Sequence, residues 1–205
     1  MKIKVCGMRE PHNMAQIARL KPDYMGFIFY ARSPRFVGSL PPEALDVLAP
    51  DIQRIGVFVD APETYILDMA ERYRLDGVQL HGSESPDLCA HLRQKHLVVK
   101  AFGVASEGDL RATVDYAGAC DYFLFDTKTP AHGGSGQAFD HSILAAYTGD
   151  TPYFLSGGIG EADAASLREW HDDRCVGVDI NSRFEHAPGV KDTEAVERFI
   201  TKLRA

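Results

Sequence analysis

A thiol and a carboxylate each stand at the end of a run of residues that is typical of a buried strand. Cys6 follows the first such run, and Asp126 closes the run "DYFLFD". Because side chains alternate along a strand, Asp126 is expected on the opposite face from Phe123 and Phe125, whose rings suit an outer layer. An acid and a base at two strand ends would serve proton transfer on one substrate. Each has a structural alternative, since cysteine often packs in cores and aspartate often caps loops.

Lys4 shares a strand face with Cys6, and positive charge near a thiol favours the thiolate. If that face points into the interior of a closed sheet, the lysine needs a carboxylate partner, for which Asp179 is the candidate. Cys6 would then be able to act as a general base.

Two polar turns follow the last two strand-like runs. One carries Gly157 and Gly158, and the other carries Asn181 and Ser182. In parallel barrels these loops often bind phosphate through backbone N–H groups. The structural alternative is that the glycines only make tight turns.

Further polar residues follow other strand-like runs. Arg32 and Arg35 flank a Ser-Pro pair, and an arginine there would grip a carboxylate with paired hydrogen bonds, unless it is simply exposed. Asp60 and His81 are each compatible with a structural hydrogen bond or with a site. The glycine-rich loop after Asp126 is typical of a lid over a substrate.

The elements that must position these residues repeat along the chain. Eight short apolar runs, rich in β-branched and aromatic residues, are typical of buried strands. They read "IKVCGM", "YMGFIFY", "RIGVFVD", "GVQLHG", "LVVKAFGV", "DYFLFD", "PYFLSGG" and "CVGVDINS". Segments with helical periodicity separate them, as in 62–77, 85–95 and 191–205.

Eight strand–helix units in 205 residues, about 25 residues each, predict a single-domain (β/α)8 barrel, the TIM-barrel fold, over residues 1–205. An open doubly wound sheet is the alternative, weakened because no strand-like run leads into a G-x-G-x-x-G turn. In a barrel, the polar strand ends meet at one rim, where barrel enzymes carry their sites.

Composition narrows the class of protein. The chain is 45% hydrophobic with a net charge of −7, and no basic cluster indicates nucleic acid as a partner. The four cysteines are scattered without metal-ligand spacing, which favours the reducing cytoplasm and predicts no metal site. No apolar run is long enough for a membrane span, and no exposed apolar stripe is evident, which favours a monomer.

The motifs together resemble those of phosphoribosylanthranilate isomerase of tryptophan biosynthesis. The matching stretches run in the family's order from the first strand to the last loop. They are "KVCGM", "GFIFYARSPRFV", "VQLHGSE", "FDTKTPAHGGSGQAFD", "LSGGI" and "GVDINSRFEHAPGVKD". The resemblance implies an Amadori rearrangement of a phosphorylated small-molecule substrate, with no cofactor.

The resemblance also implies roles for particular residues. Asp126 would be the general acid that protonates the furanose ring oxygen, and Cys6 the general base that takes the proton from sugar C2. The remaining residues would bind the substrate: Arg35 the anthranilate carboxylate, the backbone at Gly157, Gly158, Asn181 and Ser182 the phosphate, Asp179 the sugar hydroxyls, and His81 a further contact. Arg183 departs from the glycine that follows Asn-Ser in many family members.

Three alternatives stay open at this point. The related isomerase of histidine biosynthesis is expected to have a carboxylate where this chain has Cys6. Indole-glycerol-phosphate synthase needs a lysine and a glutamate at the rim that the motifs do not supply. A non-catalytic phosphosugar-binding barrel would need the glycine turns but no acid–base pair.

Overall fold

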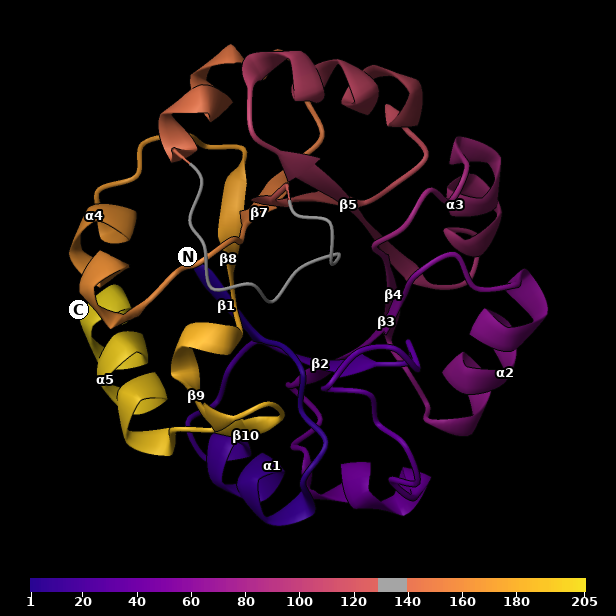
Figure 1. Cartoon of the computed structure of the whole chain (residues 1–205), viewed down its shortest axis with the longest axis vertical. Helices are drawn as coiled ribbons and strands as arrows, with labels where there is room; N and C mark the ends of the chain where they lie inside the picture. The colour runs from indigo at the N-terminus through magenta and orange to yellow at the C-terminus, as the bar shows by residue number, and fades with distance from the viewer. Residues whose placement is uncertain (129–139) are drawn as a thin grey trace.

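Eight parallel strands close into a barrel in the computed structural model, which describes residues 1–128 and 140–205. Each strand pairs with its neighbours in chain order, and the last pairs with the first, as the view down the barrel in Figure 1 shows. The strands are β1 (Lys2–Val5), β2 (Tyr24–Ile28), β3 (Gln53–Phe58), β4 (Gly77–Leu80), β5 (Leu97–Val104), β6 (Tyr122–Thr127), β7 (Tyr153–Leu155) and β8 (Cys175–Ile180). Each lies on a predicted run, so the predicted (β/α)8 barrel is confirmed and the open sheet was the wrong alternative.

Alternation along the strands builds two apolar layers. The barrel interior is filled by Tyr24, Ile55, Val99, Ala101, Leu124 and Phe154, while a larger cluster lies between the strands and the outer segments. Strand β6 belongs to both layers: Leu124 points inward, and Phe123 and Phe125 pack outward against Tyr147. Asp126 continues the inward face of β6 at the carboxyl end of the strand.

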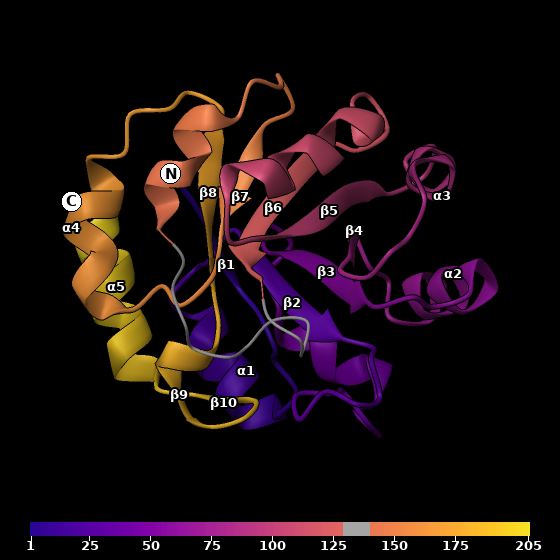
Figure 2. The same cartoon turned by 45° about the horizontal axis from the view of Figure 1, so that its top comes forward.

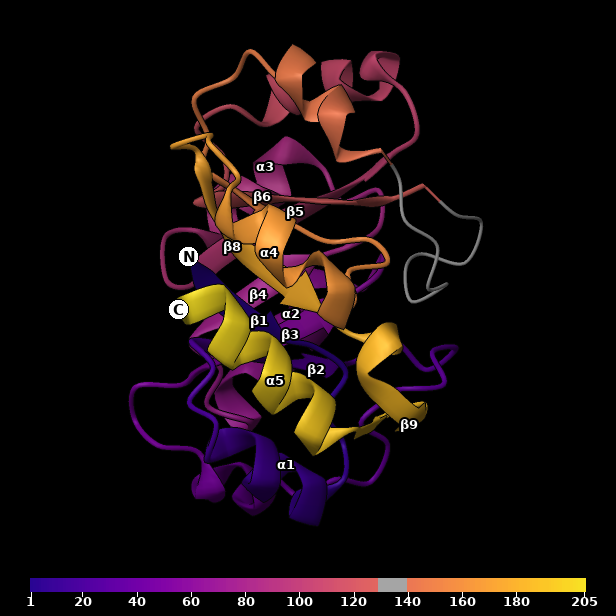
Figure 3. The ribbon, with the colours of Figure 1, turned by 90° about the vertical axis from the view of Figure 1, so that its left-hand side faces the viewer.

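The outer layer mixes α-helices with 3-10 helices. The α-helices are α1 (Pro11–Ala18), α2 (Glu63–Arg72), α3 (Pro86–Leu92), α4 (Ala164–Arg168) and α5 (Thr193–Arg204), and α4 and α5 lie side by side in Figure 3. Helix α3 begins at a Ser85 cap that accepts the N–H of Leu88 at 3.2 Å. No helix in the described ranges has the length and apolar character that a membrane crossing requires.

After β2, β5 and β6 the outer segments are the 3-10 helices η1 (Pro42–Val47), η2 (Glu107–Tyr116) and η3 (His141–Ala146). A 3-10 helix is tighter and narrower than an α-helix. The shorter elements η4 (Glu161–Asp163) and η5 (Ser182–Phe184) follow β7 and β8. The glycine-rich loop predicted as a lid falls largely at residues 129–139, outside the described part of the chain.

A small hairpin follows β8 and was not predicted. Its strands are β9 (Glu185–Ala187) and β10 (Val190–Lys191), joined through Gly189 at a φ of +84°. Figures 1 and 2 place the hairpin beside α1, and the Asn13 amide of α1 exchanges hydrogen bonds with the backbone of Lys191. The hairpin therefore brings two buried charged side chains, Glu185 and Lys191, to the barrel rim.

Candidate active site

Cys6 lies directly after β1 and faces the barrel interior. Its N–H continues the β1–β8 ladder by donating to the Ile180 carbonyl at 2.9 Å. Both Cys6 Sγ and Lys4 Nζ lie close to Gly26. A Cβ added to Gly26 would stand 2.7 Å from Sγ and 3.1 Å from Nζ. Gly26 therefore makes room for both polar ends because it has no side chain.

The carboxylate of Asp179 on β8 is the partner of Lys4, as the strand positions predicted. Lys4 Nζ donates to Asp179 Oδ1 at 2.9 Å, and both side chains are almost fully buried. Burial alone would lower the pKa of Lys4, but Asp179 and Cys6 raise it above its ordinary value. Burial raises the pKa of Asp179, and the Lys4 ammonium opposes that rise.

The Cys6 thiol responds to the same charges. Burial raises the pKa of Cys6, the Lys4 ammonium lowers it, and Asp179 raises it further, so that the net direction is upward. The thiol is thus the favoured form of Cys6 over a wider pH range than for an exposed cysteine.

Asp126 and His81 meet across the barrel mouth. His81 Nε2 lies 3.4 Å from Asp126 Oδ2, and Asp126 Oδ1 accepts the Thr127 N–H at 2.8 Å. On the other side of the ring, Gln79 Nε2 lies 2.9 Å from His81 Nδ1. With Gln79 as the donor, the proton of the neutral ring is on Nε2, toward Asp126. Gln79 was not among the predicted site residues.

The turn after β7 presents backbone N–H groups. Gly157 and Gly158 both adopt left-handed backbone, at φ values of +85° and +66°. Within residues 1–128 and 140–205, neither N–H has a hydrogen-bond acceptor. Successive N–H groups in such a turn form a concave anion-binding surface. By contrast, the N–H of Gly160 is already held by Asp163 Oδ2 at 2.7 Å.

Asn181 and Ser182 stand at the end of β8, but the Asn181 side chain turns inward. Its Oδ1 accepts from Lys191 Nζ at 2.6 Å and its carbonyl accepts the Phe184 N–H at 3.1 Å, so the backbone N–H is the group that it offers to a ligand. Ser182 begins η5, so its N–H has no partner within that helix. The side chain of Arg183 passes over Gly160, with Cδ 3.3 Å from the place of a Cβ there.

Arg35 reaches the rim but is already paired. Its Nε and Nη2 donate to the Glu185 carboxylate at 2.7–3.0 Å, and Glu185 also accepts from Lys191 at 2.6 Å. Although burial alone would raise it, the two cations hold the pKa of Glu185 below its ordinary value. Nη1 of Arg35 makes no hydrogen bond to the described residues, so one edge of the guanidinium faces away from Glu185.

Two residues near the rim are surrounded by protein side chains. A Cβ on Gly7, the residue after Cys6, would stand 2.8 Å from both Arg35 Cδ and Asn181 Oδ1. Gly7 therefore makes room for protein side chains. Phe29, directly after β2, belongs to the outer apolar cluster: it is buried and stacks on Phe58 with ring centroids 5.2 Å apart.

Asp60 makes structural hydrogen bonds between two loops, which was one of its two predicted roles. Its Oδ1 accepts the Ser83 N–H at 2.6 Å, and its own N–H donates to Glu84 Oε1 at 2.9 Å. Glu84 in turn pairs with the buried Lys100 at 3.3 Å. These contacts tie the loop after β3 to the loop after β4, which carries His81.

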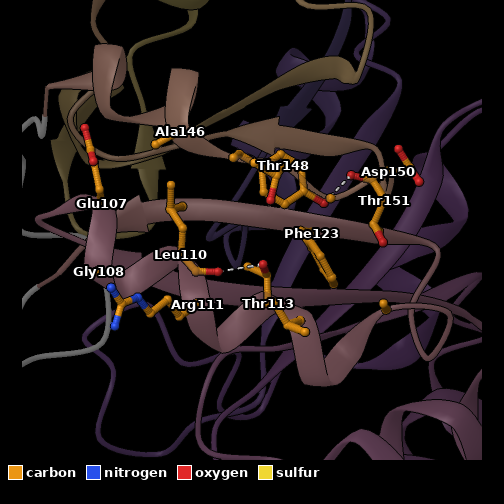
Figure 4. A pocket seen from close by; sticks show the side chains of 14 residues that line it. Glu107, Gly108, Leu110, Arg111, Thr113, Phe123, Ala146, Thr148, Asp150 and Thr151 are labelled. Carbon is orange, nitrogen blue, oxygen red and sulfur yellow. Dashed lines mark hydrogen bonds between the residues drawn. The ribbon is translucent and has the colours of Figure 1, made fainter.

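A cavity of about 530 Å³ lies elsewhere, between η2 and η3 on the outside of the barrel. Figure 4 shows Glu107 and Gly108 at one end and Asp150 and Thr151 at the other. The narrow 3-10 helices leave this groove over the outward face of Phe123. None of the predicted site residues lines it, so it is separate from the rim. The described residues contain no cluster of three or more His, Cys, Asp or Glu suited to a metal ion.

A closed parallel barrel with an acid, a thiol and a glycine turn at one rim defines a TIM-barrel enzyme. The family model for N-(5'phosphoribosyl)anthranilate (PRA) isomerase matches residues 3–202. The N-(5'-phosphoribosyl)anthranilate isomerase of Parabacteroides distasonis is 45% identical over 206 residues, covering 99% of this chain and 93% of that protein. The chain therefore belongs to the N-(5'-phosphoribosyl)anthranilate isomerase family.

Solved structures give the same family. Phosphoribosyl anthranilate isomerase from Thermotoga maritima superposes with a TM-score of 0.88 and 32% identity, covering 100% of this chain and 98% of that one. A phosphoribosyl anthranilate isomerase in complex with reduced 1-(o-carboxyphenylamino)-1-deoxyribulose 5-phosphate superposes with a TM-score of 0.86 and 30% identity. The match covers 100% of this chain and 98% of that one.

Proposed function

We propose that the chain catalyses the cofactor-free Amadori rearrangement of N-(5'-phosphoribosyl)anthranilate to 1-(2-carboxyphenylamino)-1-deoxyribulose 5-phosphate in tryptophan biosynthesis. The observation that carries this proposal is the placement of Asp126 and Cys6. Both face the barrel mouth, from β6 and from the end of β1, with β7 and β8 between those strands. A sugar bound in the mouth would meet an acid on one side and a base on the other.

Asp126 would open the ring. Its carboxylic acid gives a proton to the furanose oxygen, the C1–O bond breaks, and the nitrogen lone pair forms a C1=N iminium. The Thr127 N–H and the His81 ring hold the Asp126 carboxyl in place while its charge changes. Positioning by fixed donors is how such a group keeps a productive geometry.

Cys6 would complete the rearrangement. Its thiolate takes the proton from C2, and the C–H electron pair forms a C1=C2 bond while the iminium nitrogen becomes neutral. The resulting enolamine then tautomerises to the ketone. No external oxidant or reductant is needed, because the sugar's C1 is reduced while C2 is oxidised.

The phosphate would bind at the two turns after β7 and β8. The N–H groups of Gly157 and Gly158 and the backbone at Asn181 and Ser182 supply donors there. Arg183, whose stem crosses Gly160 beside these turns, adds a positive charge near the phosphate.

Arg35 and Asp179 would bind the substrate through the atoms that do not contact their protein partners, Glu185 and Lys4. The guanidinium of Arg35 has a second edge, toward Nη1, suited to the anthranilate carboxylate. Asp179 uses Oδ1 for Lys4, and its second oxygen would accept from a sugar hydroxyl.

Replacement of Gly157 by alanine is expected to lower kcat/KM by about 100-fold. An added Cβ would stand 2.7 Å from the Thr127 backbone nitrogen and 3.2 Å from Asp126 Oδ1, so the end of β6 must move. Gly118→Ala is the matched control, because Gly118 has a similar φ of +79° with open space around it. Both variants lose about 1–2 kcal/mol of stability to backbone strain. Equal kcat/KM values for the two variants would refute the predicted role of this turn.

The decisive experiment follows the fluorescence of freshly made phosphoribosylanthranilate as it is consumed, with the histidine-pathway aminoribosyl phosphate offered in parallel. Turnover of the first substrate is expected. Turnover of the second alone would favour the histidine-pathway isomerase, which the thiol of Cys6 disfavours. Binding of phosphate compounds with no turnover of either substrate would favour the binding-only barrel.

We infer that the protein is a monomer and that it works in the cytoplasm. All four cysteines are free, which suits a reducing compartment. Among the described residues, the large apolar side chains that are exposed are Met1, Val47 and Val114, and they do not form a stripe along one element.

A further inference from the structure

The buried lysine on β1 has more than one negative neighbour. The Lys4 side chain is only 2% exposed and donates to Asp179 Oδ1. The same ammonium stands beside Cys6 Sγ above Gly26. An ammonium has three donors, so one hydrogen bond to Asp179 leaves donors for a second partner.

The charged groups that face Cys6 come from several elements. Besides Lys4 on its own strand, they are Asp179 on β8 and Lys191 on β10. Asp126 on β6 and His81, directly after β4, face Asp179 from the far side of the mouth. The barrel interior near Cys6 thus holds cations and carboxylates that oppose one another.

Lys191 and Lys4 differ in how many hydrogen-bond partners their ammonium groups already have. Lys191 Nζ is held at 2.6 Å by both Glu185 Oε1 and Asn181 Oδ1. Glu185 is itself fixed by Arg35, so this group is a closed network. Lys4 has one hydrogen-bonded carboxylate partner in the described residues and lies against the thiol. Lys4 is therefore the cation that is able to interact with both Asp179 and Cys6.

We propose that Lys4 is the positioning residue that stabilises the thiolate of Cys6, and that Asp179 and Cys6 compete for its charge. This inference rests on the proposed function of Cys6 as the general base. When the thiolate takes the C2 proton, the S–H bond forms, the negative charge leaves Sγ, and the ammonium remains paired with Asp179. Neither charge is stranded in the barrel interior at any step.

If Cys6 and Asp179 compete for the Lys4 ammonium, substitutions of Lys4 and of Asp179 should shift the pKa of Cys6 in opposite directions. Lys4→Gln removes the charge but keeps a donor for Asp179, so the pKa of Cys6 should rise by about one unit or more. Asp179→Asn frees the ammonium for Cys6, so the pKa of Cys6 should fall. A role in packing alone would not make these two substitutions act in opposite directions.

The titration is measured on the folded full chain as thiolate absorbance near the ultraviolet edge, taken as the difference between each variant and the same variant carrying Cys6→Ser. The pH profile of kcat/KM gives a second readout, in which the limb that rises with pH moves in the same direction as the titration. Lys2→Gln is the matched control, because Lys2 lies on the same strand but pairs with Tyr24 at the opposite end of the barrel. It should leave the Cys6 titration unchanged.

A second variant protects the test against misfolding, because Lys4→Gln leaves Asp179 as an unpaired buried charge. The double variant Lys4→Gln with Asp179→Asn replaces the pair by two neutral amides. Its Cys6 pKa should lie above the wild-type value and below that of Lys4→Gln, since the Lys4 charge has a larger effect on Cys6 than the Asp179 charge.

The inference is overturned if the double variant titrates like the wild type, or if the two single variants shift the Cys6 pKa in the same direction. Failure of the proposed function is distinguishable from this result. If Cys6→Ser turns over substrate normally, Cys6 is not the base, whatever its titration shows. If Cys6→Ser is inactive while the Lys4 variants titrate like the wild type, only the role of Lys4 fails.

Discussion

Asp126→Asn should lower kcat by about 100- to 10,000-fold, the usual contribution of a positioned general acid. An amide has the shape of the carboxyl group but cannot release a proton to the ring oxygen. The substitution preserves the local geometry, because the amide oxygen can still accept the Thr127 N–H that Asp126 Oδ1 accepts at 2.8 Å. KM should change little, since the contacts proposed for the phosphate and the carboxylate come from other strands.

The measurement is the single-turnover decay of phosphoribosylanthranilate fluorescence, with thermal unfolding recorded on the same samples. Asp115→Asn, on the exposed surface of η2, is the control for the same chemical change away from the rim. A folded Asp126→Asn protein with wild-type kcat would remove Asp126 from the mechanism. Loss of activity only in proportion to loss of folded protein would also count against its catalytic role.

Cys6→Ser should cause a loss of similar size, about 100- to 10,000-fold in kcat, because a serine hydroxyl is far less acidic than a thiol and offers no anion to take the C2 proton. In the wild type, burial raises the pKa of Cys6, and a cysteine is able to act as a general base only in its deprotonated form. The rate should therefore increase with pH until the thiol has titrated. This limb of the pH profile should be absent from Cys6→Ser.

Cys175→Ser is the matched control for the thiol. Cys175 lies at the start of β8, at the opposite end of the barrel, and burial raises its pKa to about 12. Its replacement should leave both kcat and the pH profile unchanged. If Cys175→Ser removes the rising limb, or if Cys6→Ser retains it, the limb belongs to another group and Cys6 is not the base.

Much of the rim was predictable because strand ends in a parallel barrel converge. Once "DYFLFD" is assigned to a strand, alternation places Asp126 inward and its phenylalanines outward, and the structure has this arrangement. The same argument paired Lys4 with Asp179 from strands at opposite ends of the chain. These predictions use only the two-residue period and the closure of the sheet.

Two of the residues that were missed come from a segment without a strand or helix period. Glu185 and Lys191 stand in a short hairpin whose two strands have five residues in total, too few for an alternating pattern. Gln79 lies within a buried run and looks like any polar residue of a strand. Glu185 has its role through its contact with Arg35, 150 residues away in the sequence, whereas Gln79 contacts His81, two residues further along the chain.

The sequence by itself determined the eight strands, their order, the inward face of each and the family, because apolar periodicity and ordered motifs are local properties of a chain. Only the tertiary structure decided how charge is distributed at the rim. Arg35 is committed to Glu185 on one edge, Gly7 accommodates Arg35 and Asn181, and Lys191 is held by Glu185 and Asn181. Burial and competition between charges depend on distances of a few ångströms between distant segments, and those distances exist only after the barrel has closed.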